Sequence, residues 1–176
     1  MNLILIGYRA TGKTTLARLL AERLGWSWVD LDEQIELAAG KPIAQIFEQD
    51  GEPAFREFES KTVQEWCGRD AVVIATGGGA PLREENRRAM KASGKVVWLT
   101  ASPETIHARM QGDATTAARR PALTAAGGLE EIVRLLAQRE PIYRQTADFV
   151  VDTEGRSPEQ LADELLGMLE SSDERN

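Results

Sequence analysis

The sequence has one cysteine, Cys67, and one histidine, His107, among its 176 residues. A single cysteine excludes an internal disulfide and a cysteine metal cluster. A reducing compartment is the simplest interpretation, and we expect a cytoplasmic protein. No second histidine, cysteine or paired carboxylate lies at metal-ligand spacing from His107, so we interpret it as a structural or surface residue.

Long hydrophobic runs and an excess of positive charge are also missing. No apolar run approaches the ~18 residues that a membrane span needs, and the first residues lack the basic segment of a signal peptide. We therefore expect no membrane association. The formal net charge is −7, which argues against a nucleic-acid partner, because such proteins carry basic surfaces. Any anionic ligand must be held by arginines and lysines placed locally against this average field.

The chain does contain a phosphate-binding loop of the form G-x-x-x-x-G-K-[ST] at residues 7–14. An apolar run at residues 3–6 predicts a strand before it, and leucines four residues apart predict a helix after it. Backbone N–H groups of such a loop converge on phosphates at the start of the helix. We predict that the nucleotide contacts Gly7, Tyr8, Arg9, Ala10, Thr11, Gly12, Lys13, Thr14 and Thr15. Lys13 should reach the β- and γ-phosphates, and the Thr14 hydroxyl should bind Mg²⁺.

A second strand, predicted at residues 26–31, ends in Asp30-Leu31-Asp32. Residues two apart share one face of a strand, so both carboxylates point the same way if the strand continues to its end. In a parallel α/β sheet that end lies beside the phosphate loop. There the carboxylates suit hydrated Mg²⁺ or a substrate hydroxyl, and Asp30 is our candidate near the metal. The alternative is that Asp32 caps the next helix.

Arg56 is flanked by two glutamates on a helix predicted from about residue 53 to residue 67. Glu52 precedes it by four residues and Glu59 follows by three, so all three side chains can interact. They form either a solvated row of weak ion pairs or an arginine oriented to grip a carboxylate in a bidentate fork. The sequence leaves both interpretations open.

Two further features indicate a bound ligand. Gly77, Gly78 and Gly79 follow a strand predicted at residues 71–75, and they suggest either a backbone that approaches a ligand or a flexible turn. Arg139 falls in the middle of the apolar stripe of a helix predicted at residues 129–143. An unpaired charge there is costly, so either a protein carboxylate or an anionic substrate must meet it.

Residues 111–127 are small and polar without periodicity, and they include Arg120 next to Pro121. We interpret this segment as a lid that brings an arginine to the phosphates, the alternative being a mobile surface loop. Strands predicted at 3–6, 26–31, 71–75, 95–100 and 147–151 alternate with helices. This order predicts one α/β domain spanning residues 1–176, a five-stranded parallel sheet flanked by helices on both faces. Helices within residues 33–61 form a substrate-binding subdomain in this scheme.

Over residues 3–170 the chain resembles the shikimate kinase family of nucleoside-monophosphate-kinase-like P-loop proteins. The resemblance is carried by the phosphate loop, Asp30-Leu31-Asp32, Ile46-Phe47, Gly51-Glu52, Phe55-Arg56 with Glu59, Ala75 through Gly79, Arg120-Pro121 with Leu123, and Arg139 with Pro141 and Tyr143. It implies a monomeric kinase that uses ATP and Mg²⁺ to phosphorylate the 3-hydroxyl of shikimate. Tyr8 and Arg9 depart from the apolar or small residues that the family often has there.

The resemblance also implies roles for individual residues. Asp32 would hold the substrate hydroxyls and serve as candidate base, and Asp30 would reach Mg²⁺ through water. The remaining roles are a carboxylate grip by Arg56 and Arg139, a substrate-lining backbone at Gly77 to Gly79, a lid arginine at Arg120, and adenine contacts from Arg109 and Arg156. A gluconate kinase-like enzyme and a non-catalytic nucleotide-binding module are the alternatives.

Overall fold

The computed structural model describes residues 1–112 and 128–173 of the chain, and five strands in these ranges form one parallel sheet. The strand order is β2-β3-β1-β4-β5. The bounds are β1 Asn2–Ile6, β2 Ser27–Asp30, β3 Val72–Ala75, β4 Gly94–Thr100 and β5 Phe149–Asp152. The predicted five-stranded parallel sheet is confirmed, with each strand within about two residues of its expected place.

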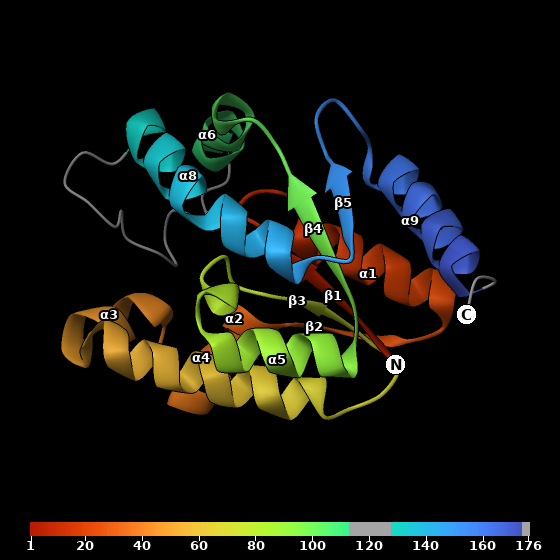
Figure 1. Ribbon diagram of the computed structural model, residues 1–176. Helices are drawn as coiled ribbons and strands as arrows, with labels where there is room; N and C mark the ends of the chain where they lie inside the picture. The colour runs from red at the N-terminus through yellow and green to blue at the C-terminus, as the bar shows by residue number, and fades with distance from the viewer. Residues whose placement is uncertain (113–127, 174–176) are drawn as a thin grey trace.

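Helices cover both faces of this sheet, as predicted (Figure 1). The bounds are α1 Lys13–Leu24, α2 Leu31–Ala39, α3 Ile43–Gln49, α4 Gly51–Cys67, η1 Ala80–Leu82, α5 Glu84–Ser93, α6 Pro103–Gly112, α8 Leu129–Thr146 and α9 Pro158–Asp173. Helices α1 and α9 pack against one face, whereas α4, α5 and α8 pack against the other. No helix in the described ranges has the length and apolar character that crossing a bilayer requires.

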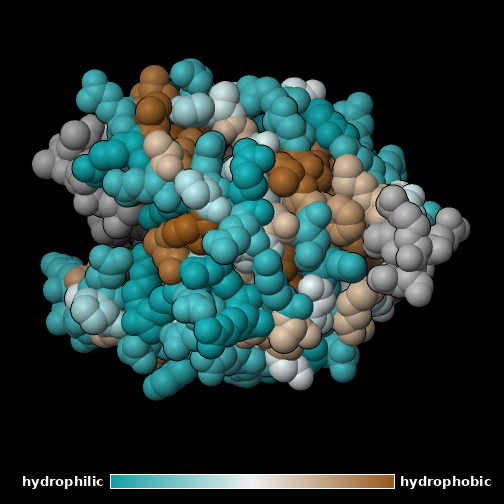
Figure 2. All heavy atoms as spheres, viewed as in Figure 1, coloured by the Kyte–Doolittle hydropathy of each residue, from teal (hydrophilic) through white to brown (hydrophobic). Residues whose placement is uncertain are grey.

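The alternation of side chains along the strands explains the two layers. In β1, Leu3 and Leu5 join the cluster with α1 and α9, while Ile4 and Ile6 join the cluster with α4, α5 and α8. Every residue of β1 is buried, because a parallel strand in the middle of a sheet has helices on both sides. The face seen in Figure 2 is mostly hydrophilic, with small hydrophobic areas between the polar side chains.

Helices α2, α3 and α4 share a hydrophobic cluster away from the sheet, made by the buried side chains Ile35, Ile43, Ile46 and Phe55. The Phe47 ring packs on the Phe55 ring at a centroid distance of 4.7 Å. This cluster packs α2, α3 and the first part of α4 together, and Arg56 directly follows Phe55 on α4.

Two sequence expectations need correction. The strand that leads to Asp30 does not continue to Leu31: α2 begins there, so Asp30 and Asp32 do not share a strand face. Asp30, not Asp32, is the N-cap of α2, and its carboxylate accepts a hydrogen bond from the Asp32 N–H at 2.9 Å. Gln111 and Gly112, expected in the lid, are the last residues of α6, and residues 113–127 lie outside the described ranges.

Candidate active site

The phosphate loop runs from the end of β1 to the start of α1, with Gly12 as the N-cap of the helix. Gly7 has φ +138° and Gly12 has φ +89°, both in a region that L side chains rarely adopt. A Cβ on Gly7 would also lie 2.5 Å from the Leu99 carbonyl oxygen. Ala10 takes φ +61° without being glycine. The loop therefore has the special backbone that anion binding needs.

The Lys13 side chain folds back over this loop. Its Nζ donates to the carbonyl oxygens of Gly7 at 3.0 Å and of Tyr8 at 2.7 Å, and the residue is 9% exposed. The Thr11 hydroxyl donates to the same Tyr8 carbonyl at 2.8 Å. These bonds keep an ammonium group directly above the loop, which is where phosphate charge would have to be neutralised.

A hydroxyl and a carboxylate meet at the other side of the loop. Thr14 Oγ1 donates to Asp30 Oδ2 at 2.6 Å. The second oxygen of Asp30 caps α2, so both oxygens of the carboxylate are held by hydrogen bonds. Asp32 lies in the first turn of α2 and is half-buried. Thr14, Asp30 and Asp32 thus gather beside the loop, although by a strand-to-helix turn and not by strand alternation. Hard oxygen ligands of this kind suit Mg²⁺.

Arg109 and Arg156 line a cavity of about 220 Å³ together with loop and α1 residues, among them Ala10, Gly12 and Thr15. Arg109 donates from Nη1 to the Thr153 hydroxyl and from Nη2 to the Thr153 carbonyl, both at 3.0 Å, and it reaches the Ala10 carbonyl at 3.4 Å. Arg156 is ion-paired with Glu164. Both arginines therefore border the phosphate loop.

The triple-glycine segment lies between the phosphate loop and two arginines. A Cβ added to Gly78 would be 3.3 Å from the Gly7 carbonyl oxygen and 3.5 Å from Nη1 of Arg139. A Cβ on Gly79 would collide with Nη1 of Arg56. Residues 77–79 are fully enclosed. Glycine is required at position 79 because the Arg56 guanidinium occupies the place of a Cβ, whereas at position 78 the closest neighbour is the Gly7 carbonyl oxygen.

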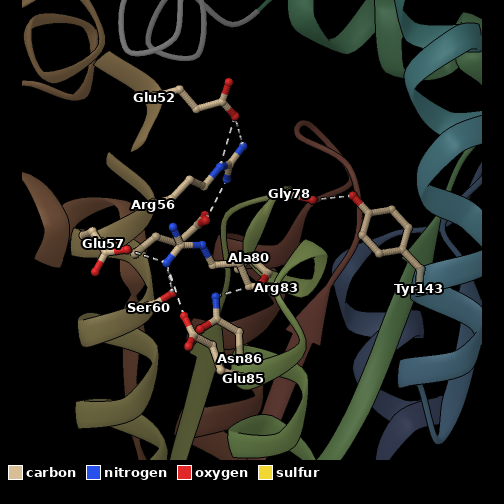
Figure 3. Close-up of polar contacts among 11 residues, drawn as sticks. Glu52, Arg56, Glu57, Ser60, Gly78, Ala80, Arg83, Glu85, Asn86 and Tyr143 are labelled. Atoms are coloured by element: carbon tan, nitrogen blue, oxygen red, sulfur yellow. Dashed lines mark hydrogen bonds and ion pairs between the residues drawn. The ribbon is translucent and has the colours of Figure 1, made fainter. Parts of the chain in front are cut away.

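Arg56 is held by both flanking glutamates (Figure 3). Its Nη2 lies 3.0 Å from Glu52 Oε1, and its Nη1 lies 2.7 Å from Glu59 Oε2. The Glu52 side chain is 59% exposed, whereas Glu59 is 1% exposed and Arg56 is 12% exposed. The solvated-row alternative is therefore wrong for the Arg56–Glu59 pair, which is buried against Gly79.

Arg139 is 8% exposed, in agreement with its place in the apolar stripe of α8. Its guanidinium carbon lies 5.6 Å from the centre of the Tyr8 ring. Among the residues that the structure describes, no carboxylate forms an ion pair with Arg139 and no group accepts a hydrogen bond from it. A buried guanidinium without an anion is costly, so this geometry favours a ligand carboxylate as its partner.

A nucleotide loop next to inward arginines fits phosphoryl transfer to an acid, and the chain is similar to proteins with that activity. The family model described as shikimate kinase matches residues 9–170. The chain belongs to the shikimate kinase family. The shikimate kinase of Rhodopirellula baltica is 46% identical over 97% of this chain and 91% of its own length.

Solved structures similar to this member of the shikimate kinase family include the enzyme from Acinetobacter baumannii in complex with shikimate. That structure has a TM-score of 0.91 at 36% identity, covering 97% of this chain and 93% of the other. A gluconokinase from Sinorhizobium meliloti has a TM-score of 0.58 at 14% identity over 99% and 94% of the chains, which shows a shared fold only.

Most residues proposed from the shikimate kinase resemblance converge on one end of the sheet. Two groups of side chains meet there. Thr14 with Asp30, Arg109 and Arg156 border the phosphate loop, and Arg56 and Arg139 border the glycine segment. Arg120 lies outside the described residues. His107 is on α6 with its Nε2 3.5 Å from Gln111 Nε2. The described residues contain no group of three or more His, Cys, Asp or Glu side chains placed to hold a metal ion.

Sequence reasoning missed two contacts that position this shikimate kinase site. The Tyr143 hydroxyl donates to the Gly78 carbonyl at 2.5 Å, and the Thr153 side chain and carbonyl hold Arg109. Tyr143 follows Arg139 by four residues, so the helical period places both on one face of α8. That spacing was the signal that could have paired them. Thr153 follows β5 directly, and nothing local marks it.

Proposed function

We propose that this chain is a shikimate kinase that transfers the γ-phosphoryl group of ATP to the 3-hydroxyl of shikimate. Membership of the family supports the reaction. The observation within the chain that carries the proposal is the Arg139 guanidinium, which is buried beside Gly78 and the phosphate loop without an acidic partner among the described residues. A small carboxylic acid would supply that partner within reach of a nucleotide's terminal phosphate.

The acid would bind between two arginines and the glycine segment. Arg139 offers its N–H groups to the carboxylate, and a bidentate fork fixes the direction of the acid. Arg56 is oriented by Glu52 and Glu59 on the other side of Gly79. Asp32 would then orient the hydroxyl for attack, as a hydrogen-bond acceptor and candidate base. In this arrangement the protein contributes position and charge, which phosphoryl transfer mainly requires.

The nucleotide would bind along the phosphate loop, with its base toward Arg109 and Arg156. When bound, ATP supplies the γ-phosphoryl group and Mg²⁺ neutralises charge on its phosphates. Thr14 and Asp30 would hold the metal, Asp30 through water. Lys13, now bonded to the carbonyls of Gly7 and Tyr8, would turn toward the phosphates. We also propose a cytoplasmic monomer, helices within residues 33–61 as the acid-binding unit, and residues 111–127 with Arg120 as a lid.

A steady-state assay with shikimate and gluconate as alternative acceptors tests this function. We expect ATP-dependent turnover of shikimate and none of gluconate. Turnover of gluconate alone would assign the site to the other kinase class. Loss of turnover in Asp32→Ala with unchanged ATP binding is the expected control, whereas a wild-type chain that binds ATP but phosphorylates neither acid would make it a nucleotide-binding module.

A further inference from the structure

The phosphate loop carries an aromatic side chain that is fully enclosed. Tyr8 is 2% exposed and packs with Ile106 of α6 and with Ile132 and Leu136 of α8. Its hydroxyl is buried and has no hydrogen-bond partner among the residues that the structure describes. The polar end of this side chain therefore has no visible structural use, and its ring is the part that makes contacts.

The same ring contacts the guanidinium that the proposed function assigns to the acid. The Arg139 guanidinium carbon lies over the Tyr8 ring at 5.6 Å from its centre. Leu136, one turn earlier on α8, belongs to the same buried cluster as Tyr8. Tyr8 thus lies beside one face of this helix. A cation within about 6 Å of an aromatic face is attracted by it, more strongly where water is excluded.

We propose that the Tyr8 ring is a positioning element for Arg139, supplied by the nucleotide loop itself. Contact with a ring uses none of the N–H donors of arginine, so the fork remains available for a carboxylate. In the free protein, where Arg139 has no ion-pair partner in the described ranges, the ring also provides an electrostatic contact for its charge. The ring holds the guanidinium toward Gly78, whose Cβ position is 3.5 Å from Nη1.

The consequence is that affinity for the acid depends on a side chain of the phosphate loop that does not touch the acid. This inference rests on the proposed function, because it takes Arg139 as the carboxylate-binding group. It adds that a non-aromatic residue at position 8 leaves Arg139 free to turn away from the glycine segment, which weakens acid binding more than nucleotide binding.

Titration calorimetry of the full chain with shikimate, and separately with ATP, tests the inference. Tyr8→Leu should raise the dissociation constant for shikimate about fivefold to thirtyfold and raise that for ATP much less. Tyr8→Phe keeps the ring and should recover most of the acid affinity that Tyr8→Leu loses. Should Tyr8→Leu fail to fold, Tyr8→Met is the second non-aromatic variant. Ile106→Val is the matched control, since it removes one methyl group from the same cluster. It should lower Tm without weakening the binding of shikimate.

Four results would overturn the role of the ring. They are an unchanged shikimate affinity in Tyr8→Leu, an equal loss in Tyr8→Phe, an equal loss of ATP affinity, and an equal loss in Ile106→Val. Arg139→Ala separates this inference from the function beneath it. If Arg139→Ala abolishes acid binding while Tyr8→Leu does not weaken it, only the inference fails. If Arg139→Ala binds shikimate normally, the assignment of the acid site fails as well.

Discussion

The Tyr143 hydroxyl donates a 2.5 Å hydrogen bond to the carbonyl of Gly78, and both residues are fully buried. Figure 3 shows the phenol reaching from α8 to the glycine segment. Arg139 lies one turn earlier on the same helix, and its Nη1 is 3.5 Å from the place that a Cβ of Gly78 would take. Two side chains of α8 therefore border this segment. The backbone that would line the acid is therefore fixed by the helix that carries the arginine.

Tyr143→Phe should weaken shikimate binding and lower the free energy of unfolding by about 1–3 kcal/mol, because the buried Gly78 carbonyl loses a donor. Calorimetry with shikimate and denaturant unfolding measure the two effects. Thr146→Val is a matched control on the same helix, since the buried Thr146 hydroxyl donates to the Ile142 carbonyl at 2.6 Å. Thr146→Val should lower the free energy of unfolding and leave the affinity for shikimate unchanged. Equal shikimate affinity in both variants would reduce Tyr143 to a packing role.

Asp30→Asn should separate helix capping from metal binding. Asparagine caps helices as well as aspartate does, so it can still accept from the Asp32 N–H and α2 should keep its stability. The loss of charge beside Thr14 should raise the Mg²⁺ concentration for half-maximal activity about tenfold or more. Asp30→Ala should lose the cap too, at about 1 kcal/mol. An unchanged Mg²⁺ requirement in Asp30→Asn would remove Asp30 from the metal site.

Glu59→Ala should lower the free energy of unfolding far more than Glu52→Ala, although both glutamates pair with Arg56. Removing the buried carboxylate leaves the Arg56 guanidinium with only its exposed partner, Glu52, and should cost about 3 kcal/mol. Removing the exposed carboxylate of Glu52 should cost about 0–1 kcal/mol. Denaturant unfolding compares the two, and KM for shikimate should rise mainly in Glu59→Ala. Equal costs would mean that burial does not decide the strength of these pairs.

Cys67 should react slowly with thiol reagents at neutral pH. Burial raises the pKa of its thiol, partly offset by a hydrogen bond with Ser93, so less reactive thiolate is present at a given pH than in a free thiol. Alkylation by iodoacetamide at pH 8 should therefore be slower than alkylation of glutathione and should approach it after unfolding in urea. A folded-state rate equal to that of glutathione would contradict the direction of this shift.

Local patterns in the sequence were enough for the sheet, the phosphate loop and the inward direction of Arg139. Each depends on a period or spacing that the fold preserves, such as the 3.6-residue repeat that placed Arg139 on the apolar face of α8. The prediction that Asp30 and Asp32 share a strand face was wrong, because the strand ends at Asp30, which serves as the N-cap of α2. The contact between Tyr8 and Arg139 joins residues 131 positions apart, and no local signal encodes such a pair.

A crystal structure with shikimate and a non-hydrolysable ATP analogue tests the central claim most directly. We expect the shikimate carboxylate to lie within hydrogen-bonding distance of the Arg139 guanidinium, beside Gly78, with the terminal phosphate along residues 7–14. An Arg139 side chain engaged by the protein's own carboxylates, with shikimate bound elsewhere, would contradict it.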